Sequence, residues 1–226
     1  MPLETIMEEA GRNGIDAMAL TDINNTMGMI DFVRLCNDNH IKPLAGVEFR
    51  NGDDMLYLGI ARNNEGFREL NEFLGKHNIS GENYPVKPAG LENVIVIYPA
   101  GNIPANTLNE NEYIGIKPAE VNRLISPAFR NHIGRSVILC PVTFNDEAGY
   151  YLHMNLRAID KNILISRLIP RNLASPAEKM IPAGNLVKYY GEYPVIISNT
   201  EKLIQDCSVS FDYNTIKNKR TFTGNR

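Results

Sequence analysis

The sequence of 226 residues contains no tryptophan, only three cysteines and only four histidines. It has no apolar run of about 18 residues and no signal-peptide pattern, so neither a membrane-spanning helix nor export is predicted. The cysteines, Cys36, Cys140 and Cys207, are far apart, and none belongs to a Cys-x-x-Cys pair. They are predicted to be reduced thiols of a cytoplasmic protein, not a disulfide framework or a zinc site.

Several motifs of catalysis and nucleotide binding are also absent. The sequence has no GxGxxG, no GxxxxGK[ST] and no GxSxG, which excludes the dinucleotide-binding loop, the P-loop and the nucleophile elbow. Cys140 is the best-placed thiol, at the end of a predicted strand. Because Pro141 follows it and no histidine shares its motif, we interpret Cys140 as a core thiol.

The charge balance is slightly acidic, with a formal net charge of -3 and a pI of about 5.9. The chain as a whole is therefore not a basic nucleic-acid-binding protein. Residues 213–226 carry Lys217, Lys219, Arg220 and Arg226 and no acidic residue. They predict a basic tail, which either is a solvated linker or contacts DNA.

Hydrophobic periodicity predicts strands that alternate with helices. Alternation favours a parallel α/β sheet with crossover helices in one domain, 1–212, but it does not separate an open sheet from a barrel. The predicted strands span residues 15–21, 42–49, 55–61, 94–98, 113–116 and 136–142. The predicted helices span residues 2–12, 27–39, 63–76, 118–125, 147–161, 184–190 and 194–207.

Two acidic residues, Asp22 and Glu48, follow or end consecutive predicted strands. In a parallel sheet their carboxylates are expected to lie close together, as ligands of a divalent cation or as an acid/base pair. A structural interpretation also stays open, in which Asp22 caps the turn at residues 24–26 and Glu48 pairs with Arg50.

The histidines do not support a transition-metal site. His40 and His77 fall at the C-terminal ends of predicted helices, His132 lies in a loop, and His153 lies inside a helix. None is at the C-terminal end of a strand, whereas hydrolytic metal sites need several converging imidazoles.

Four segments resemble a known family. Ala-Leu-Thr-Asp-Ile-Asn-Asn-Thr (19–26), Ile-Lys-Pro-Leu-Ala-Gly-Val-Glu-Phe (41–49) and Ile-Ala-Arg-Asn-Asn-Glu-Gly-Phe-Arg-Glu-Leu (60–70) resemble the PHP (polymerase and histidinol phosphatase) domain of bacterial DNA polymerase III alpha subunits. The segment 193–207 resembles the helix that closes that domain ahead of the polymerase palm. The resemblance implies a distorted TIM-like (β/α)7 barrel, here lacking its first strand, with a helical C-terminal segment.

The resemblance also implies a degenerate metal site. Asp22 and Glu48 match acidic metal-site positions of the family, and the opening His-x-His strand would precede Met1. We therefore expect no cofactor at these vestigial positions, with weak magnesium or manganese binding as the alternative. Residues without a metal-binding side chain stand where the family's remaining ligands would fall: Ile23, Leu56, Pro141 and Thr143.

The function implied by the resemblance is that of the PHP portion of a replicative DNA-directed DNA polymerase, a nucleotidyltransferase. The chain alone is expected to be catalytically inactive, because the family's polymerase carboxylates lie in the palm. Its implied partners are the rest of the alpha subunit, a proofreading exonuclease subunit, and DNA through the parent polymerase. Residues 213–226 would begin the linker to the palm. The alternatives are a free-standing PHP metal-dependent phosphoesterase with a reduced site, and an interaction module whose basic tail contacts DNA.

Overall fold

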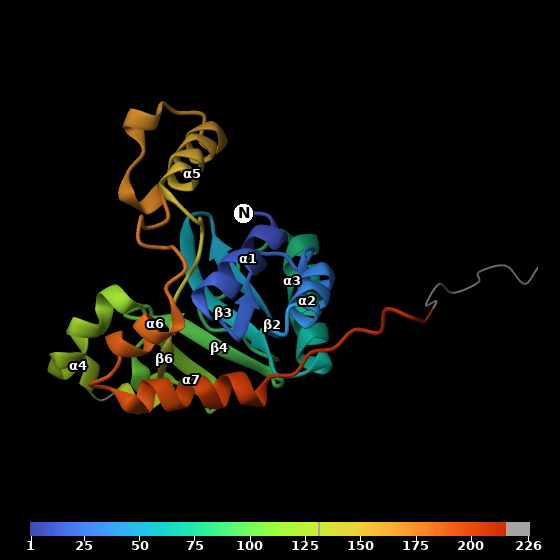
Figure 1. The fold of residues 1–226 in the computed structure, drawn as a ribbon, viewed down its shortest axis with the longest axis vertical. Coiled ribbons are helices and arrows are strands. Elements are labelled where there is room, and N and C mark those ends of the chain that lie inside the picture. The colour runs from blue at the N-terminus through green and yellow to red at the C-terminus, as the bar shows by residue number, and fades with distance from the viewer. Residues whose placement is uncertain (131, 216–226) are drawn as a thin grey trace, which may run out of the picture.

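The computed structural model describes residues 1–130 and 132–215, which fold into a curled six-stranded sheet flanked by helices (Figure 1). The strands are hydrogen-bonded in chain order, from β1 to β6, and β1 does not pair with β6 within the described residues. The sheet is therefore a half-barrel, in agreement with the predicted distorted TIM-like fold. The strands are β1 (Ala17–Leu20), β2 (Lys42–Asn51), β3 (Asp54–Ala61), β4 (Val94–Pro99), β5 (Glu112–Ile116) and β6 (Ser136–Ile138).

The sheet is mixed, because β3 runs antiparallel to both of its neighbours. Three pairs of strands are parallel: β1 with β2, β4 with β5, and β5 with β6. β3 is antiparallel to β2 and to β4, so the prediction of a wholly parallel sheet is wrong at this strand. The physical reason is a short turn between Asn51 and Asp54. Gly52 adopts a φ of +62°, which favours glycine and lets the chain return directly beside β2.

The helices lie close to the predicted positions. Residues 118–125 form a 3₁₀ helix and not an α-helix, and the last strand ends at Ile138 instead of Val142. The strand is shorter because Pro141 has no N–H to donate to a sheet. The α-helices are α1 (Leu3–Asn13), α2 (Met29–Asp38), α3 (Asn64–Ser80), α4 (Pro127–Arg130), α5 (Glu147–Asp160), α6 (Ala183–Tyr189) and α7 (Pro194–Asp206). The 3₁₀ helices are η1 (Ala105–Thr107), η2 (Pro118–Ile125), η3 (Ile133–Arg135), η4 (Ile165–Arg167) and η5 (Pro170–Asn172).

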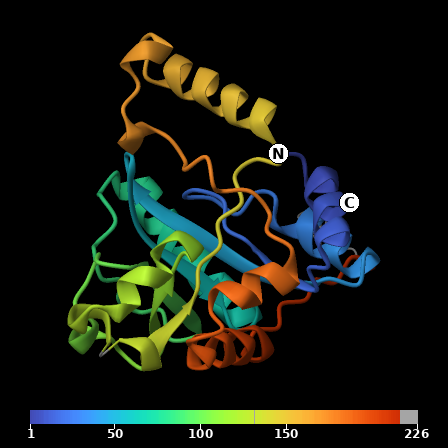
Figure 2. The ribbon, with the colours of Figure 1, turned by 60° about the vertical axis from the view of Figure 1, so that its left-hand side comes forward.

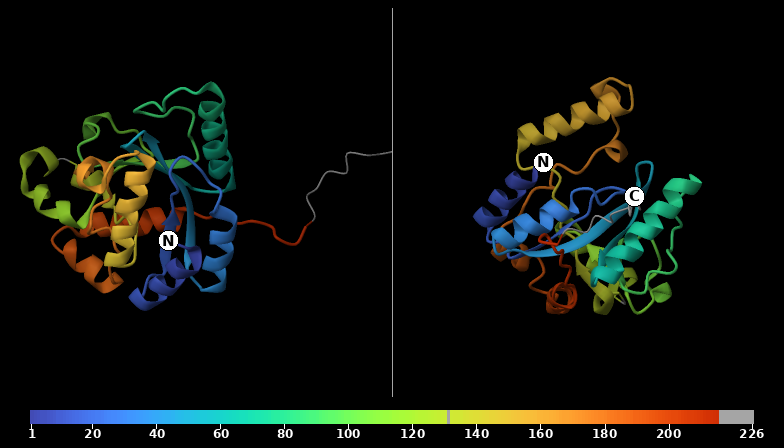
Figure 3. Two further views of the ribbon diagram at one scale, coloured as in Figure 1. Left: turned by 90° about the horizontal axis from the view of Figure 1, so that it is seen from above. Right: turned by 90° about the vertical axis from the view of Figure 1, so that its right-hand side faces the viewer.

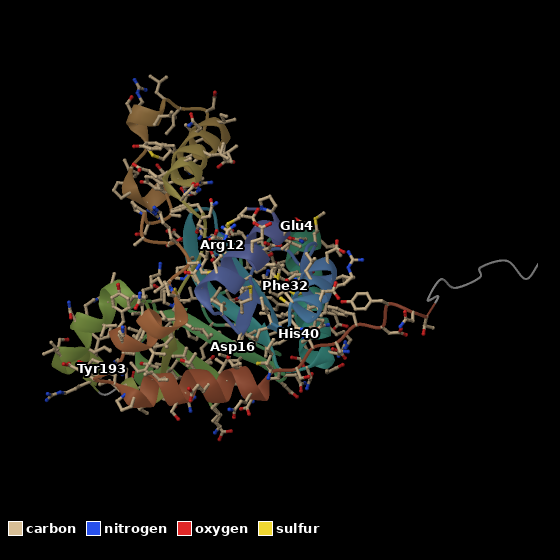
Figure 4. All side chains as sticks on the ribbon, viewed as in Figure 1. Glu4, Arg12, Asp16, Phe32, His40 and Tyr193 are labelled. Carbon is tan, nitrogen blue, oxygen red and sulfur yellow. The ribbon has the colours of Figure 1, made fainter. Side chains whose placement is uncertain are left out.

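Side-chain alternation along the strands divides the core between the two faces of the sheet. In β3, Tyr57 and Ala61 belong to the larger cluster, and Leu58 and Ile60 to the smaller one. The larger cluster includes side chains of α1, α2 and α3, and Figure 4 shows Phe32 of α2 among them. The smaller cluster includes two side chains at the C-terminal end of α7, Leu203 and Cys207.

Helix α7 also covers the outer edge of β6. The Ile138 N–H donates to the Thr200 hydroxyl at 2.9 Å, and the Asn199 amide nitrogen donates to the Ser136 carbonyl at 2.9 Å. Two backbone groups of an edge strand are thereby satisfied by side chains of a helix.

The segment 147–172, which contains α5, η4 and η5 and is called the arm below, projects beyond the end of the sheet (Figures 1 and 2). The right-hand view of Figure 3 shows the same separation from a further direction. The tip of the β2–β3 turn holds the arm through Asp53. Its carboxylate accepts hydrogen bonds from Lys161 at 2.5 Å, from Asn172 at 3.0 Å and from Arg157.

Protonation of Asp53 is expected to release the arm. Its hydrogen bonds, that from Lys161 first, lower the pKa of the Asp53 carboxyl to about 2, from an ordinary value near 3.8. The stabilisation is therefore present above pH 4 and is lost as the pH falls toward 2. Limited pepsin digestion between pH 4 and pH 2 should show cleavage in residues 147–172 that rises as the pH falls.

Substitution of Asp53 provides the control for this pH dependence. The Asp53→Asn variant should be cleaved in the arm already at pH 4, with little further change down to pH 2. Asp54→Asn should change arm cleavage less, because the Asp54–Arg171 ion pair is exposed to solvent. Equal arm cleavage of the wild type and Asp53→Asn at pH 4 would contradict the anchoring role of Asp53.

Candidate functional site

The two acidic residues lie where β1 and β2 continue as a short parallel ladder. The Glu48 N–H donates to the Asp22 carbonyl at 3.1 Å, and the Asn24 N–H donates to the Glu48 carbonyl at 2.9 Å. This pattern places Ile23 opposite Glu48, as an isolated parallel bridge. The residue directly beside Glu48 is therefore Ile23, and Asp22 is one position earlier.

A difference of one position places the two carboxylates on opposite faces of the sheet. Glu48 lies between Val47 and Phe49, which both point into the larger core cluster, so Glu48 points to the other face. Asp22 is on the same face as Val47, and a Cβ atom on Gly28 would come within 3.3 Å of Asp22 Oδ2. The prediction that the Asp22 and Glu48 carboxylates converge is therefore wrong, because side chains alternate along each strand.

Glu48 has a basic partner on its own face. The guanidinium of Arg50 donates to Glu48 Oε1. The Glu48 side chain is only 14% exposed and the Arg50 side chain 30%. The predicted Glu48–Arg50 pair is confirmed. Because the guanidinium neutralises the carboxylate in a partly buried place, binding of a cation to Glu48 would require this ion pair to separate.

Asp22 lies in a different environment, beside the start of α2. Burial raises the pKa of the Asp22 carboxyl, and a hydrogen bond from the Gly28 N–H partly offsets that rise. Two other side chains also hold the turn at residues 24–26. Asn24 bonds to the Arg50 backbone in both directions, at 3.0 and 2.9 Å, and Asn25 accepts from the Met27 N–H at 3.1 Å. Asp22, whose carboxylate accepts from the Gly28 N–H just beyond the turn, therefore shares the predicted role in holding it with Asn24 and Asn25.

A polar hollow of about 300 Å³ lies next to Arg50, between the β2–β3 turn and the C-terminal end of α3. Its polar groups are already bonded to one another. The Asn51 amide exchanges two hydrogen bonds of 2.9 Å with the Tyr84 backbone, and His77 Nδ1 lies 3.3 Å from the Glu82 carbonyl. The hollow thus connects two parts of the fold and has few unused donors for a ligand.

The histidines are found where the sequence predicts them, none on the C-terminal end of a strand, although His77 of α3 lines the hollow beside Arg50. His40 and Asp16, both labelled in Figure 4, precede β2 and β1, so they lie at the opposite ends of these strands from Glu48 and Asp22. Within residues 1–130 and 132–215, no group of three or more His, Cys, Asp or Glu side chains is placed to hold a metal ion. The side chains at the strand ends do not fit a metal centre, because one carboxylate is paired and the other points away.

The cysteines are free, with Cys36 and Cys207 buried and Cys140 half-buried. Burial, with a smaller contribution from the Glu178 charge, raises the pKa of the Cys140 thiol. A thiol with a raised pKa is a poor nucleophile at neutral pH.

In the part of the chain that the structure describes, no helix is both long and apolar enough to cross a membrane.

A profile of the PHP domain family matches residues 1–104, which contain β1 to β4 and both acidic residues. Residues 1–104 form a PHP domain. The resemblance found in segments 19–26, 41–49 and 60–70 is therefore confirmed. The prediction that the domain extends to residue 212 is not tested by this match, and the basic side chains of the tail lie outside the described residues.

The chain is also similar to DNA polymerase III alpha subunits. It is 21% identical over 250 residues to the alpha subunits of two Neisseria meningitidis strains, and the alignment covers 92% of this chain and 22% of each relative. It is 29% identical over 82 residues to the Vibrio cholerae alpha subunit, which covers 34% of this chain and 7% of that protein. The chain thus spans about a fifth of the length of these Neisseria relatives.

Proposed function

We propose that this chain acts as the PHP region of a replicative DNA polymerase III alpha subunit, with a structural role and a degenerate metal site. The observation that carries the proposal is the similarity to alpha subunits along 92% of the chain. The polymerase reaction would then belong to the palm, outside the residues described above.

The side chains at the ends of β1 and β2 support the degenerate site. Ile23 is directly beside Glu48, where a metal ligand would be placed to share an ion with it. Arg50 instead provides the positive charge that faces Glu48. An internal guanidinium therefore takes the place of a cation, and the strand ends keep their shape without a metal.

The partners follow from the same proposal. The chain would support the rest of the alpha subunit, present a surface to a proofreading exonuclease subunit, and meet DNA through the parent polymerase in the cytoplasm. Sequencing the DNA on both sides of the reading frame tests the parent protein, with palm-encoding sequence expected downstream.

Metal binding and phosphoester hydrolysis test the degenerate site. We expect no saturable heat of binding when zinc or manganese is titrated into the purified chain. We also expect release of phosphate from p-nitrophenyl phosphate to stay at the level of the chelator-treated sample. Asp22→Ala and Glu48→Gln should give the same traces as the wild type, because neither side chain would act in catalysis.

The alternative is a free-standing phosphoesterase with a reduced site on Asp22 and Glu48. It predicts phosphate release that requires magnesium or manganese and disappears in Glu48→Gln. Such metal-dependent turnover, with the fold of the variant intact by circular dichroism, would overturn the degenerate site.

A further inference from the structure

The arm exposes an unusual number of large apolar side chains. Between residues 151 and 169, seven large apolar side chains are exposed to solvent, and four of these belong to α5. The exposed fractions in α5 are 56% for Tyr151, 60% for Leu152, 55% for Leu156 and 74% for Ile159. Contiguous exposure of this kind marks an interaction surface.

Helix α5 turns two of its polar side chains, Arg157 and His153, toward the body, whereas Asn155 is exposed on the outer side. Arg157 bonds to Asp53 and to the Asn172 carbonyl, and His153 Nε2 accepts from the Ala174 N–H at 2.9 Å. The other inward-facing residues include Tyr150, whose ring packs on Phe144. The polar groups thus anchor the arm to the body, and the aliphatic face is left for another partner.

The exposed face has the spacing of a helix-packing seam. Ala148, Leu152, Asn155 and Ile159 are separated by four, three and four residues, the interval of coiled-coil a and d positions. No charged side chain lies on this seam, since Arg157 points to the body. A charged partner surface would gain little binding free energy on this seam. The apolar face of another helix would gain more, because both apolar surfaces would be removed from water.

The charged side chains beyond the two ends of the seam would be complementary between two copies of α5 that pack in antiparallel orientation. Glu147 is exposed at the N-terminal end, and Arg167 is exposed in η4, which contacts α5 near its C-terminal end. Within the described residues Arg167 has no ion pair, and Asp160 at the same end is neutralised by Arg157. Two antiparallel copies of α5 would bring each Glu147 toward the other copy's Arg167 and align the helix dipoles favourably.

We propose that the outer face of α5 is a self-association surface, on which a second copy of this chain packs its own α5 in antiparallel orientation. Leu152 of each copy then faces Asn155 of the other, and Ala148 faces Ile159. The pairing is isologous and goes beyond the proposed polymerase role, since it uses no residue of the strand ends.

Sedimentation velocity of the whole chain tests this pairing. The mass should rise from 25.3 kDa toward twice that value across a concentration series of about 5–500 µM, as expected for a small interface. The Leu152→Asp/Ile159→Asp double variant should weaken association at least tenfold, because it places charges in the seam. Ile79→Asp, at an apolar side chain of α3 that is even more exposed, should associate like the wild type.

Charge reversal tests the orientation. Glu147→Lys and Arg167→Glu should each weaken association several-fold, and the Glu147→Lys/Arg167→Glu variant should restore it, since the opposite charges meet again. A chain that stays monomeric over the whole series would overturn the proposal. So would equal association of the wild type and Leu152→Asp/Ile159→Asp, or failure of the reversed pair to restore binding, provided that circular dichroism shows intact folds.

Discussion

Replacing Gly66 by alanine is expected to lower the free energy of unfolding by about 3 kcal/mol or more. A Cβ atom on Gly66, in the first turn of α3, would lie only 2.1 Å from the Asn93 carbonyl oxygen. That oxygen accepts a hydrogen bond of 2.9 Å from the Arg62 N–H, and the Glu69 carboxylate holds the Asn93 side chain and N–H. Because this backbone is fixed on both sides, the added methyl group must displace α3 from the sheet.

The same helix offers a matched control. Gly75 has no atom within 4 Å of the position that a Cβ would take, and it lies inside α3. Gly75→Ala should therefore stabilise the chain by about 0.5–1 kcal/mol, since alanine loses less conformational freedom in a helix. Urea unfolding followed by circular dichroism measures both changes. A Gly66→Ala variant as stable as the wild type would show that α3 can shift at no cost.

The second large effect is expected at Glu112, the first residue of β5, whose side chain is 2% exposed. Its carboxylate accepts from the Tyr98 hydroxyl at 3.1 Å and from the Asn109 N–H at 2.6 Å, and pairs with Lys87 at 3.1 Å. Burial, together with this carboxylate, raises the pKa of the Tyr98 hydroxyl, which therefore remains a donor. Glu112→Ala leaves these donors without an acceptor and should cost about 3–5 kcal/mol.

Two further variants separate charge from hydrogen bonding at this position. Glu112→Gln keeps one acceptor oxygen for the Asn109 N–H, and its NH2 group can donate to the Tyr98 hydroxyl oxygen in place of the bond that Tyr98 gives to Glu112. The variant loses the negative charge that attracts Lys87, so its cost should be smaller than that of alanine, about 1–2 kcal/mol. Glu110→Ala, at an exposed acid two residues earlier, should stay within about 0.5 kcal/mol of the wild type. A Glu112→Ala variant no less stable than Glu110→Ala would refute the buried network as a stabilising element.

Much of the fold can be predicted from local patterns. The apolar period places α1, and Gly14 ends it in the left-handed conformation with a φ of +65°. The direction of β3 could also be found, since the dipeptide Asn51-Gly52 between two apolar runs is a strong hairpin signal. The alternation of strands with helices along the chain predicts the wrong direction for β3, because it treats every consecutive pair of strands as parallel strands joined by a crossover helix.

The candidate site was harder to predict. The sequence correctly selects the Glu48–Arg50 pair, whose members are two residues apart on one strand. The relation of Asp22 to Glu48 depends on the register between β1 and β2, and a change of one residue reverses the face to which a side chain points. Spacing within each strand carries no information about that register.

The anchoring role of Asp53 was missed for a similar reason. Its partner Arg157 is 104 residues away in the chain, and no local pattern connects an acid in a turn to the inner face of a distant helix. Periodicity locates α5 but does not say that its polar side faces the body. One signal was available, since Leu152 and Ile159 share one side of the helix while His153 and Arg157 lie on another.

The contacts of α7 with β6 have a consequence for solubility. A free edge strand presents unpaired N–H and C=O groups to which the strand of another molecule can add, which is the first step of edge-to-edge aggregation. Thr200 and Asn199 occupy two of those groups on β6. A helix thereby protects the open side of an unclosed barrel, and it does so with two short polar side chains that need no additional strand.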